Sequence, residues 1–165
     1  MSLIPLGILA ASGAGASAVS VAGYVAGGIG NSGIVDIVNK FAFPSDSRTT
    51  LGTGLSSDRR LLAGMSDSGV AGYAAGGYEG SAVDTVDKFA FPSDTRSTLA
   101  SGLSASREIA TGISDSGIAG YVAGGREGSE VSTVDKFAFP SDSRSTLASG
   151  LSSARESSAG FQDGL

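Results

Sequence analysis

Hydrophobic residues in this chain come in short runs rich in Val, Ile, Tyr and Phe, and Gly, Ser, Asp or Pro separates one run from the next. No run keeps the apolar spacing of three and four residues that predicts an amphipathic helix, and the abundant Gly, Ser and Thr disfavour helices further. Short β-branched and aromatic runs between turn residues are typical of strands. The pattern predicts four strands in one stretch, at residues 72–77, 82–91, 97–103 and 107–113. An all-β protein is therefore expected.

The predicted strands have apolar residues on both faces. In the second of them, Val83 and Phe89 lie on one face while Val86 and Ala90 lie on the other, because successive side chains of a strand point to opposite sides. Both faces are expected to be partly buried. Small sheets stacked radially, as the blades of a propeller are, bury both faces without helices between them. We expect large side chains of one blade to meet small ones of the next.

Two short motifs predict the turns between these strands. In "FPSD" (91–94), Pro92 pre-sets the backbone for the second position of a β-turn, and Ser93 and Asp94 can bond to the local main chain. "SDSG" (66–69 and 114–117) ends in a Gly that tolerates positive φ, which predicts a hairpin. Calcium binding by the repeated Asp residues is disfavoured, because neither loop supplies a dense set of acidic ligands.

The chain repeats itself three times. "TVDKFAFPSD" occurs at residues 85–94 and 133–142, with a looser copy at 37–46. Lys40, Lys88 and Lys136 follow one another at intervals of 48, and residues 71–117 match residues 119–165 at 33 of 47 positions. Such similarity indicates one structural unit used three times, at residues 22–70, 71–118 and 119–165. Residues 1–21 form a separate apolar leader.

The composition removes several kinds of chemistry. The chain has no His, no Cys and no Trp, which excludes a Ser-His-Asp triad, a Cys nucleophile and a zinc site with the usual ligands. A net charge of -5 without a basic stripe argues against nucleic acid as a partner. Lys and Tyr could act in acid–base catalysis, but each repeated Lys falls in a repeated strand and is more simply structural. We predict no catalytic residues, no metal and no cofactor, so the protein is expected not to be an enzyme.

A unit of this length, with Gly-Gly closing an apolar strand ("GYVAGG"), then "TVDKFAF" and a polar hairpin into "SSARESSAGF", resembles the kelch-type β-propeller repeat. The resemblance covers residues 22–165. It departs from the kelch pattern in one respect, since those repeats usually carry a Trp after the third strand. The sequence "AGYVAGG" with "VDKFAF" also resembles propeller repeats in tail and fibre proteins of bacteriophages, particularly those of cyanobacteria. The opening "MSLIPLGILAASGAG" is similar to the start of many phage virion proteins.

Three four-stranded blades cannot close a ring, because propellers have about four to eight. We therefore expect a homodimer that forms one six-bladed propeller. Ala159, Gly160 and Phe161 would begin a further blade, and we expect them to close the ring by pairing with the "AGYVAGG" strand (22–28) of the other chain. Residues 14–21 align with 63–70, so the leader is an alternative source of that strand within one chain.

The phage resemblance implies a non-enzymatic structural and attachment protein of a virion, either a tail fibre or a component of the baseplate. In this hypothesis the leader docks into other tail or baseplate proteins, and the propeller is displayed as a spacer or receptor-binding head. The leader is too short for a bilayer, which needs about 20 apolar residues, and it lacks the positive start of a secretory signal. The docking residues are Leu3, Ile4, Pro5, Leu6, Ile8 and Leu9.

The alternative is a secreted or surface carbohydrate-binding propeller that acts outside the cell. In either case a ligand such as a host-surface glycan is expected at the loops where the units differ, since loops on a rigid scaffold carry function. Drift at exposed positions explains the same differences. The candidate residues are Ile29, Asn31, Tyr78, Glu79, Arg126 and Glu127. Arg59, Arg107 and Arg155 recur in every unit and are expected to pair with an Asp or a carbonyl rather than with a ligand.

Overall fold

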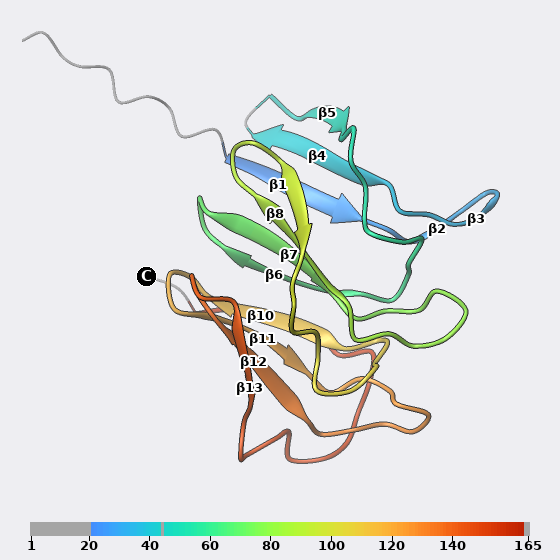
Figure 1. Ribbon diagram of the computed structural model, residues 1–165, viewed down its shortest axis with the longest axis vertical. Coiled ribbons are helices and arrows are strands. Elements are labelled where there is room, and N and C mark those ends of the chain that lie inside the picture. The colour runs from blue at the N-terminus through green and yellow to red at the C-terminus, as the bar shows by residue number, and fades with distance from the viewer. Residues whose placement is uncertain (1–20, 44, 164–165) are drawn as a thin grey trace, which may run out of the picture.

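The computed structural model of the protein describes residues 21–43 and 45–163, and every regular element among them is a β-strand. The described strands pair antiparallel into three large sheets and one small ribbon (Figure 1). The predicted all-β fold is confirmed. The first sheet has the order β1 (Val21–Ala26), β4 (Val38–Phe43), β5 (Ser47–Thr50), and β2 (Ile29–Gly30) pairs with β3 (Gly33–Ile34) as the ribbon.

The second and third sheets have four strands each, in chain order. The second contains β6 (Ala63–Asp67), β7 (Ala71–Ala75), β8 (Val86–Ala90) and β9 (Thr95–Thr98). The third contains β10 (Thr111–Asp115), β11 (Ala119–Ala123), β12 (Val134–Ala138) and β13 (Ser143–Thr146). The three large sheets lie one after another along the long axis of the molecule, with the first at the top of Figure 1 and the third at the bottom.

The first sheet lacks one strand that the other two have. In the second sheet β6 pairs with β7, with Met65 opposite Tyr73, and in the third β10 pairs with β11, with Ile113 opposite Tyr121. The corresponding edge of β1 has no partner strand in the described part of the chain. The second and third sheets thus have four strands each and the first has three, and the sheets do not follow the predicted unit boundaries, since β6 lies in the predicted first unit (22–70) and pairs in the second sheet.

The predicted strands exist, but their boundaries differ from the expected ones. Strand β8 begins at Val86 rather than at residue 82, because the amide of Val83 donates to the carbonyl of Gly77 and turns the chain away from the ladder. Strand β10 covers Thr111–Asp115 rather than 107–113, because Ile109 has a φ of 56° and interrupts the extended backbone. Strand β9 likewise lies at Thr95–Thr98, immediately after the turn, rather than at 97–103.

The predicted burial of both strand faces is confirmed in β8, where consecutive residues Val86 and Asp87 are both fully buried. The expected contact of large with small side chains occurs where Met65 lies against Gly120 of the next sheet. Aromatic rings also meet aromatic rings, which was not expected. Tyr73 stacks on Phe139 with ring centres 5.3 Å apart, and Tyr24 stacks on Phe91 in the same way.

The backbones of neighbouring sheets come closest between β6 and β10. A Cβ atom added to Gly112 would lie 1.8 Å from the carbonyl oxygen of Gly64. Side chains pack into the rest of the interface, including Met65, Tyr73, Val122 and Phe137. Glycine at position 112 thus permits the spacing between the second and third sheets.

Candidate functional site

A carboxylate of the second sheet accepts two hydrogen bonds from the first sheet. The Tyr24 hydroxyl donates to Oδ1 of Asp94 and the Lys40 ammonium to Oδ2, each at 2.7 Å. Tyr24 and Lys40 are cross-strand neighbours on β1 and β4, so the sheet register places both donors together. Asp94 lies in the "FPSD" turn with a φ of 57°. We call this group the Tyr–Lys–Asp cluster.

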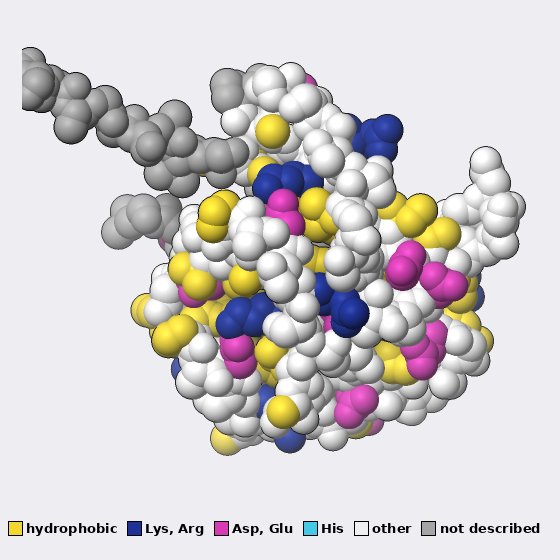
Figure 2. Space-filling view, turned by 45° about the horizontal axis from the view of Figure 1, so that its top comes forward, with side chains coloured by type: hydrophobic (Ala, Val, Ile, Leu, Met, Phe, Trp, Pro, Cys, Tyr) yellow, Lys and Arg dark blue, Asp and Glu magenta, His cyan; other side chains and the backbone are white. Residues whose placement is uncertain are grey.

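The same cluster joins the second sheet to the third. Tyr73 donates to Oδ1 of Asp142 at 2.7 Å and Lys88 to Oδ2 at 2.6 Å. Half-buried ion pairs such as Lys88 with Asp142 are screened less by salt than exposed pairs. On the face that Figure 2 shows, some basic side chains have an acidic one directly beside them. The cluster therefore holds each sheet to its successor.

The two ends of the stack carry the unmatched halves of a third cluster. Tyr121 and Lys136 face each other across β11 and β12, with the Lys136 nitrogen 5.9 Å from the centre of the Tyr121 ring. No residue in the described ranges supplies an Asp to them. At the other end, Asp46 has a φ of 54°, close to that of Asp94, and no described Tyr–Lys pair reaches it.

A second contact between sheets is an ion pair that water does not reach. Arg59 donates to the carbonyls of Gly76 and Thr85, each at 3.0 Å, and to the carboxylate of Asp87. Both side chains are fully buried. Asp87 also accepts hydrogen bonds from Ser56 and Thr98, so the buried charge is surrounded by donors.

The ion pair is repeated one sheet further on, where Arg107 donates to Asp135 at 2.7 Å with both side chains fully buried. The prediction that these arginines pair with Asp and carbonyl groups is confirmed for Arg59 and Arg107. The third arginine, Arg155, is exposed. The position equivalent to Asp87 in the first sheet holds Asn39, which accepts from Arg48 and Thr50.

Burial and these hydrogen bonds shift several pKa values. Burial raises the pKa of Tyr73 strongly, and the hydrogen bond to Asp142 raises it further. The pKa of Tyr24 is raised for the same two reasons, with Asp94 as the partner. Burial alone would raise the pKa of Asp87, but donors from Ser56 and Thr98 and the charge of Arg59 outweigh it, so this pKa is lowered. The donors around Asp87 thus favour its charged form, whereas burial lowers the pKa of its partner Arg59.

The predicted ligand-binding residues lie in equivalent connections on one side of the stack, where the ribbon β2–β3 and the loops after β7 and β11 extend together in Figure 1. Five of the six are exposed and Tyr78 is half-buried: the exposed ones are Ile29, Asn31, Glu79, Arg126 and Glu127. Arg60 lies over the Tyr78 ring, 5.0 Å from its centre, and Ser57 donates to Glu79 at 2.5 Å. Ligand binding at these positions stays a prediction.

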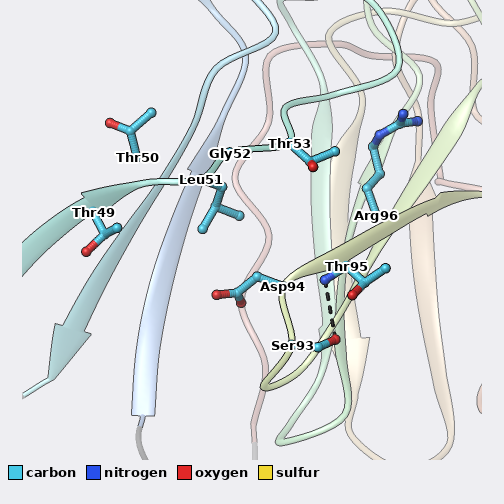
Figure 3. Close-up of a pocket in the computed structure, with 9 residues that line it drawn as sticks. All are labelled: Thr49, Thr50, Leu51, Gly52, Thr53, Ser93, Asp94, Thr95 and Arg96. Carbon is cyan, nitrogen blue, oxygen red and sulfur yellow. Dashed lines mark hydrogen bonds between the residues drawn. The ribbon is translucent and has the colours of Figure 1, made fainter.

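A shallow pocket of about 420 Å³ lies between the first and second sheets, and Figure 3 shows its lining. Thr49, Thr50 and Thr53 supply hydroxyl groups on one side, and Ser93 and Asp94 come from the turn after β8. The carboxylate of Asp94 is already bound to Tyr24 and Lys40. The pocket is thus part of the contact between sheets.

The turn prediction for "FPSD" is correct for Ser93 and wrong for Asp94. Ser93 donates to the carbonyl of Ala90 within the turn, whereas the Asp94 carboxylate reaches the neighbouring sheet. Asp94 has a φ of 57°, and its carboxylate accepts from Tyr24 and Lys40 of the first sheet. The interval of 48 gives no signal for this role, because Ser93, which bonds within its turn, recurs at the same interval.

Comparison with models of protein families gave no match, and neither did comparison with curated proteins. None of the described residues belongs to a helix long and apolar enough to cross a membrane. In the ranges 21–43 and 45–163, no three Asp or Glu residues are grouped to hold a metal ion. The predicted docking residues Leu3, Ile4, Pro5, Leu6, Ile8 and Leu9 lie outside the described residues.

Proposed function

We propose that this protein is a non-enzymatic structural and attachment protein in which each large sheet is one propeller blade and two chains form a six-bladed ring. The supporting observation is the Tyr–Lys–Asp cluster, which joins the first sheet to the second and the second to the third with the same three residue types. An interface that is repeated in this way can continue from one chain to another. The buried ion pairs of Arg59 and Arg107 recur in the same way within the chain.

The place of the protein is proposed to be a phage virion, on the tail fibre or baseplate. This part of the proposal depends on the resemblance of the repeats and the leader to phage proteins. The exposed connections carrying Asn31, Glu79 and Arg126 differ in sequence on otherwise matching sheets. A rigid stack that displays varied loops on one side is suited to act as a spacer or a receptor-binding head.

The ring is tested by the mass of the purified protein in solution. Light scattering should give twice the 16.2 kDa of one chain, with a monomer appearing only on dilution. A single-chain mass at all concentrations would contradict the six-bladed ring.

The virion role is tested by deleting residues 1–16. Particles assembled with the truncated chain should lack the protein on an immunoblot, while the purified truncated chain keeps its dimeric mass. Full incorporation of the truncated chain would contradict docking through the leader and would favour the secreted or surface carbohydrate-binding alternative.

A further inference from the structure

A groove of about 1140 Å³ runs along the unpaired edge of β1. Its lining includes Tyr24 and Val25 of β1 on one side and Gly64 and Met65 of β6 on the other. In the second and third sheets the equivalent edge is occupied by β6 and β10. The groove thus lies where the first sheet has room for one more strand.

Residues 159–163 have the position of a first strand, and no strand in the described ranges pairs with them. Ser158 accepts a hydrogen bond from Thr111 of β10 at 2.7 Å, and a Cβ added to Gly160 would lie 2.4 Å from the carbonyl oxygen of Gly112. In the same way, a Cβ added to Gly112 would lie against the carbonyl oxygen of Gly64. Residues 159–163 therefore stack on β10 as β10 stacks on β6. Phe161 in this segment is 91% exposed.

We propose that residues 159–163 of one chain insert beside β1 of a second copy, and that the second copy returns its own segment in the same way. The inference rests on the proposed two-chain ring and specifies how that ring closes. The register follows from β6 and β7, where Ala63 lies opposite Ala75 and Met65 opposite Tyr73. By this register the partner's Ala159 lies opposite Ala26, and the partner's Phe161 opposite Tyr24.

The ends of the stack are chemically matched for this exchange. In the ring, Asp46 of one copy meets the partner's Tyr121 and the partner's Lys136, which completes a third Tyr–Lys–Asp cluster. The backbone of Asp46 already has the conformation of Asp94 and Asp142, with φ values of 54°, 57° and 57°. The acid lies at one end and the base at the other, so two copies are complementary in charge.

A hydrogen bond between sheets favours the second copy over the leader as the source of the strand. Oδ1 of Asp67 accepts from the amide of Gly117 in the next sheet at 2.7 Å. In the exchanged strand Asp163 takes the position of Asp67 and can accept from Gly69, which lines the groove. The leader has Ala18 at that position and offers no carboxylate.

Engineered cysteines test the exchange directly, because the natural chain has none. The double variant Ala26→Cys with Ala159→Cys should give a covalent dimer on a non-reducing gel, since directly opposed residues of antiparallel strands lie within disulfide reach. Ala63→Cys with Ala75→Cys is the matched control, which places the same pair of positions within one chain. Its disulfide should form without a dimer.

The leader is tested by Ala14→Cys with Ala26→Cys. An intrachain disulfide in this variant, together with no covalent dimer from the first variant, would overturn the exchange. Light scattering separates this failure from that of the ring. A dimeric mass without the cross-link leaves the ring standing and removes the exchange, whereas a single-chain mass removes both.

Gly64→Ala provides a second test that does not use cysteine. A Cβ at Gly64 meets no atom within 4 Å in the single chain, so the variant should keep the melting temperature of the isolated chain. In the exchanged assembly it would point at the carbonyl of the partner's Gly160, as Gly112 points at Gly64. The dimer dissociation constant should rise about tenfold or more. An unchanged constant would overturn the proposal.

Discussion

Truncating Arg107 to Ala leaves the carboxylate of Asp135 buried without its charged partner. Breaking such a pair costs about 3–5 kcal/mol of unfolding free energy, because the remaining charge keeps its desolvation penalty. Urea unfolding at low protein concentration should show a loss of this size. Arg155→Ala is the matched control, since Arg155 is the equivalent residue and is exposed in the single chain. Equal losses in the two variants would contradict this role of the pair.

The lowered pKa of Asp87 and the raised pKa of Tyr73 predict how stability depends on pH. Asp87 binds its proton more weakly in the folded state, so its contribution is present above about pH 4 and is lost as the pH falls. Tyr73 holds its proton more tightly in the folded state, so its contribution is present below about pH 10 and is lost as the pH rises.

Urea midpoints between pH 3 and pH 11 should therefore form a plateau with a decline on each side. Tyr73→Phe should reduce the alkaline decline and leave the acid one, because the variant has no phenol to titrate at that position. An alkaline decline of the same size in the variant would contradict the role of Tyr73.

Contacts between residues of different sheets are the part of the site that the sequence predicts least well. The recurrence of Arg59 in every unit predicts that it pairs with an Asp or a carbonyl, and this is confirmed. Asp94 was predicted to bond within its turn, because turn statistics describe only neighbours in the chain, and its carboxylate lies in the next sheet instead. The repeat interval of 48 does not separate the two outcomes, because Ser93, which does bond within the turn, shares it.

At the scale of elements, the approach of β6 to β10 depends on glycine. In Gly112→Ala the added methyl would overlap the Gly64 carbonyl, 1.8 Å away, so the strands must separate. Overpacking of this kind costs about 1–3 kcal/mol, occasionally more, and the melting temperature should fall accordingly. Gly69→Ala is an unsuitable control because of its positive φ, whereas Gly52→Ala has open space and should have little effect. A normal melting temperature for Gly112→Ala would contradict this spacing.

The strands were predicted better than their boundaries. Short apolar runs between turn residues identified β7, around Tyr73, and β8, with Val86 and Phe89. It could not show that β10 begins only at Thr111, because the positive φ of Ile109 has no signature in a β-branched residue. The repeat alone also could not show to which sheet β6 belongs, because a repeat fixes the length of the unit and not where each unit begins. The "SDSG" hairpin made that assignment, because it joins the end of one unit to the start of the next.

At the scale of the whole molecule, Asp46 and Asp94 occupy equivalent positions in two repeats. Only Asp94 binds a Tyr and a Lys within the described chain. Asp94→Asn removes an ion pair within one chain and should lower the stability of that chain by about 1 kcal/mol. Asp46→Asn should leave the single chain unchanged and raise the dimer dissociation constant about fivefold, because in the proposed ring its partners lie on the second copy. Sedimentation and urea unfolding measure the two effects separately. A destabilised single chain in Asp46→Asn would contradict this division.

In the proposed two-chain ring, the seam between copies differs from the interfaces within one chain at residue 39. Asn39 has an amide nitrogen where Asp87 and Asp135 have a carboxylate oxygen. Inside the chain, Asp135 accepts from Arg107 and from Ser104. At the seam the partner's Arg155 meets Asn39, whose Oδ1 is already used by Arg48 and Thr50, so the amide nitrogen faces the incoming donors. The amide group of Asn39 and the guanidinium of the partner's Arg155 are both hydrogen-bond donors, so they do not bind each other. The proposed ring therefore predicts a contact between copies that is weaker than the contact between sheets of one chain.

Asn39→Asp should convert this seam into a copy of the internal interface. The new carboxylate accepts from the partner's Arg155, and the dimer dissociation constant should fall about tenfold or more, as close charge pairs at interfaces do. Sedimentation of the variant across a dilution series measures the change. Adding Arg155→Ala to the variant should abolish the gain, which separates the new ion pair from any effect of the substitution on its own sheet. A dissociation constant unchanged by Asn39→Asp would mean that residue 39 does not face the second copy, and the two-chain ring would be wrong.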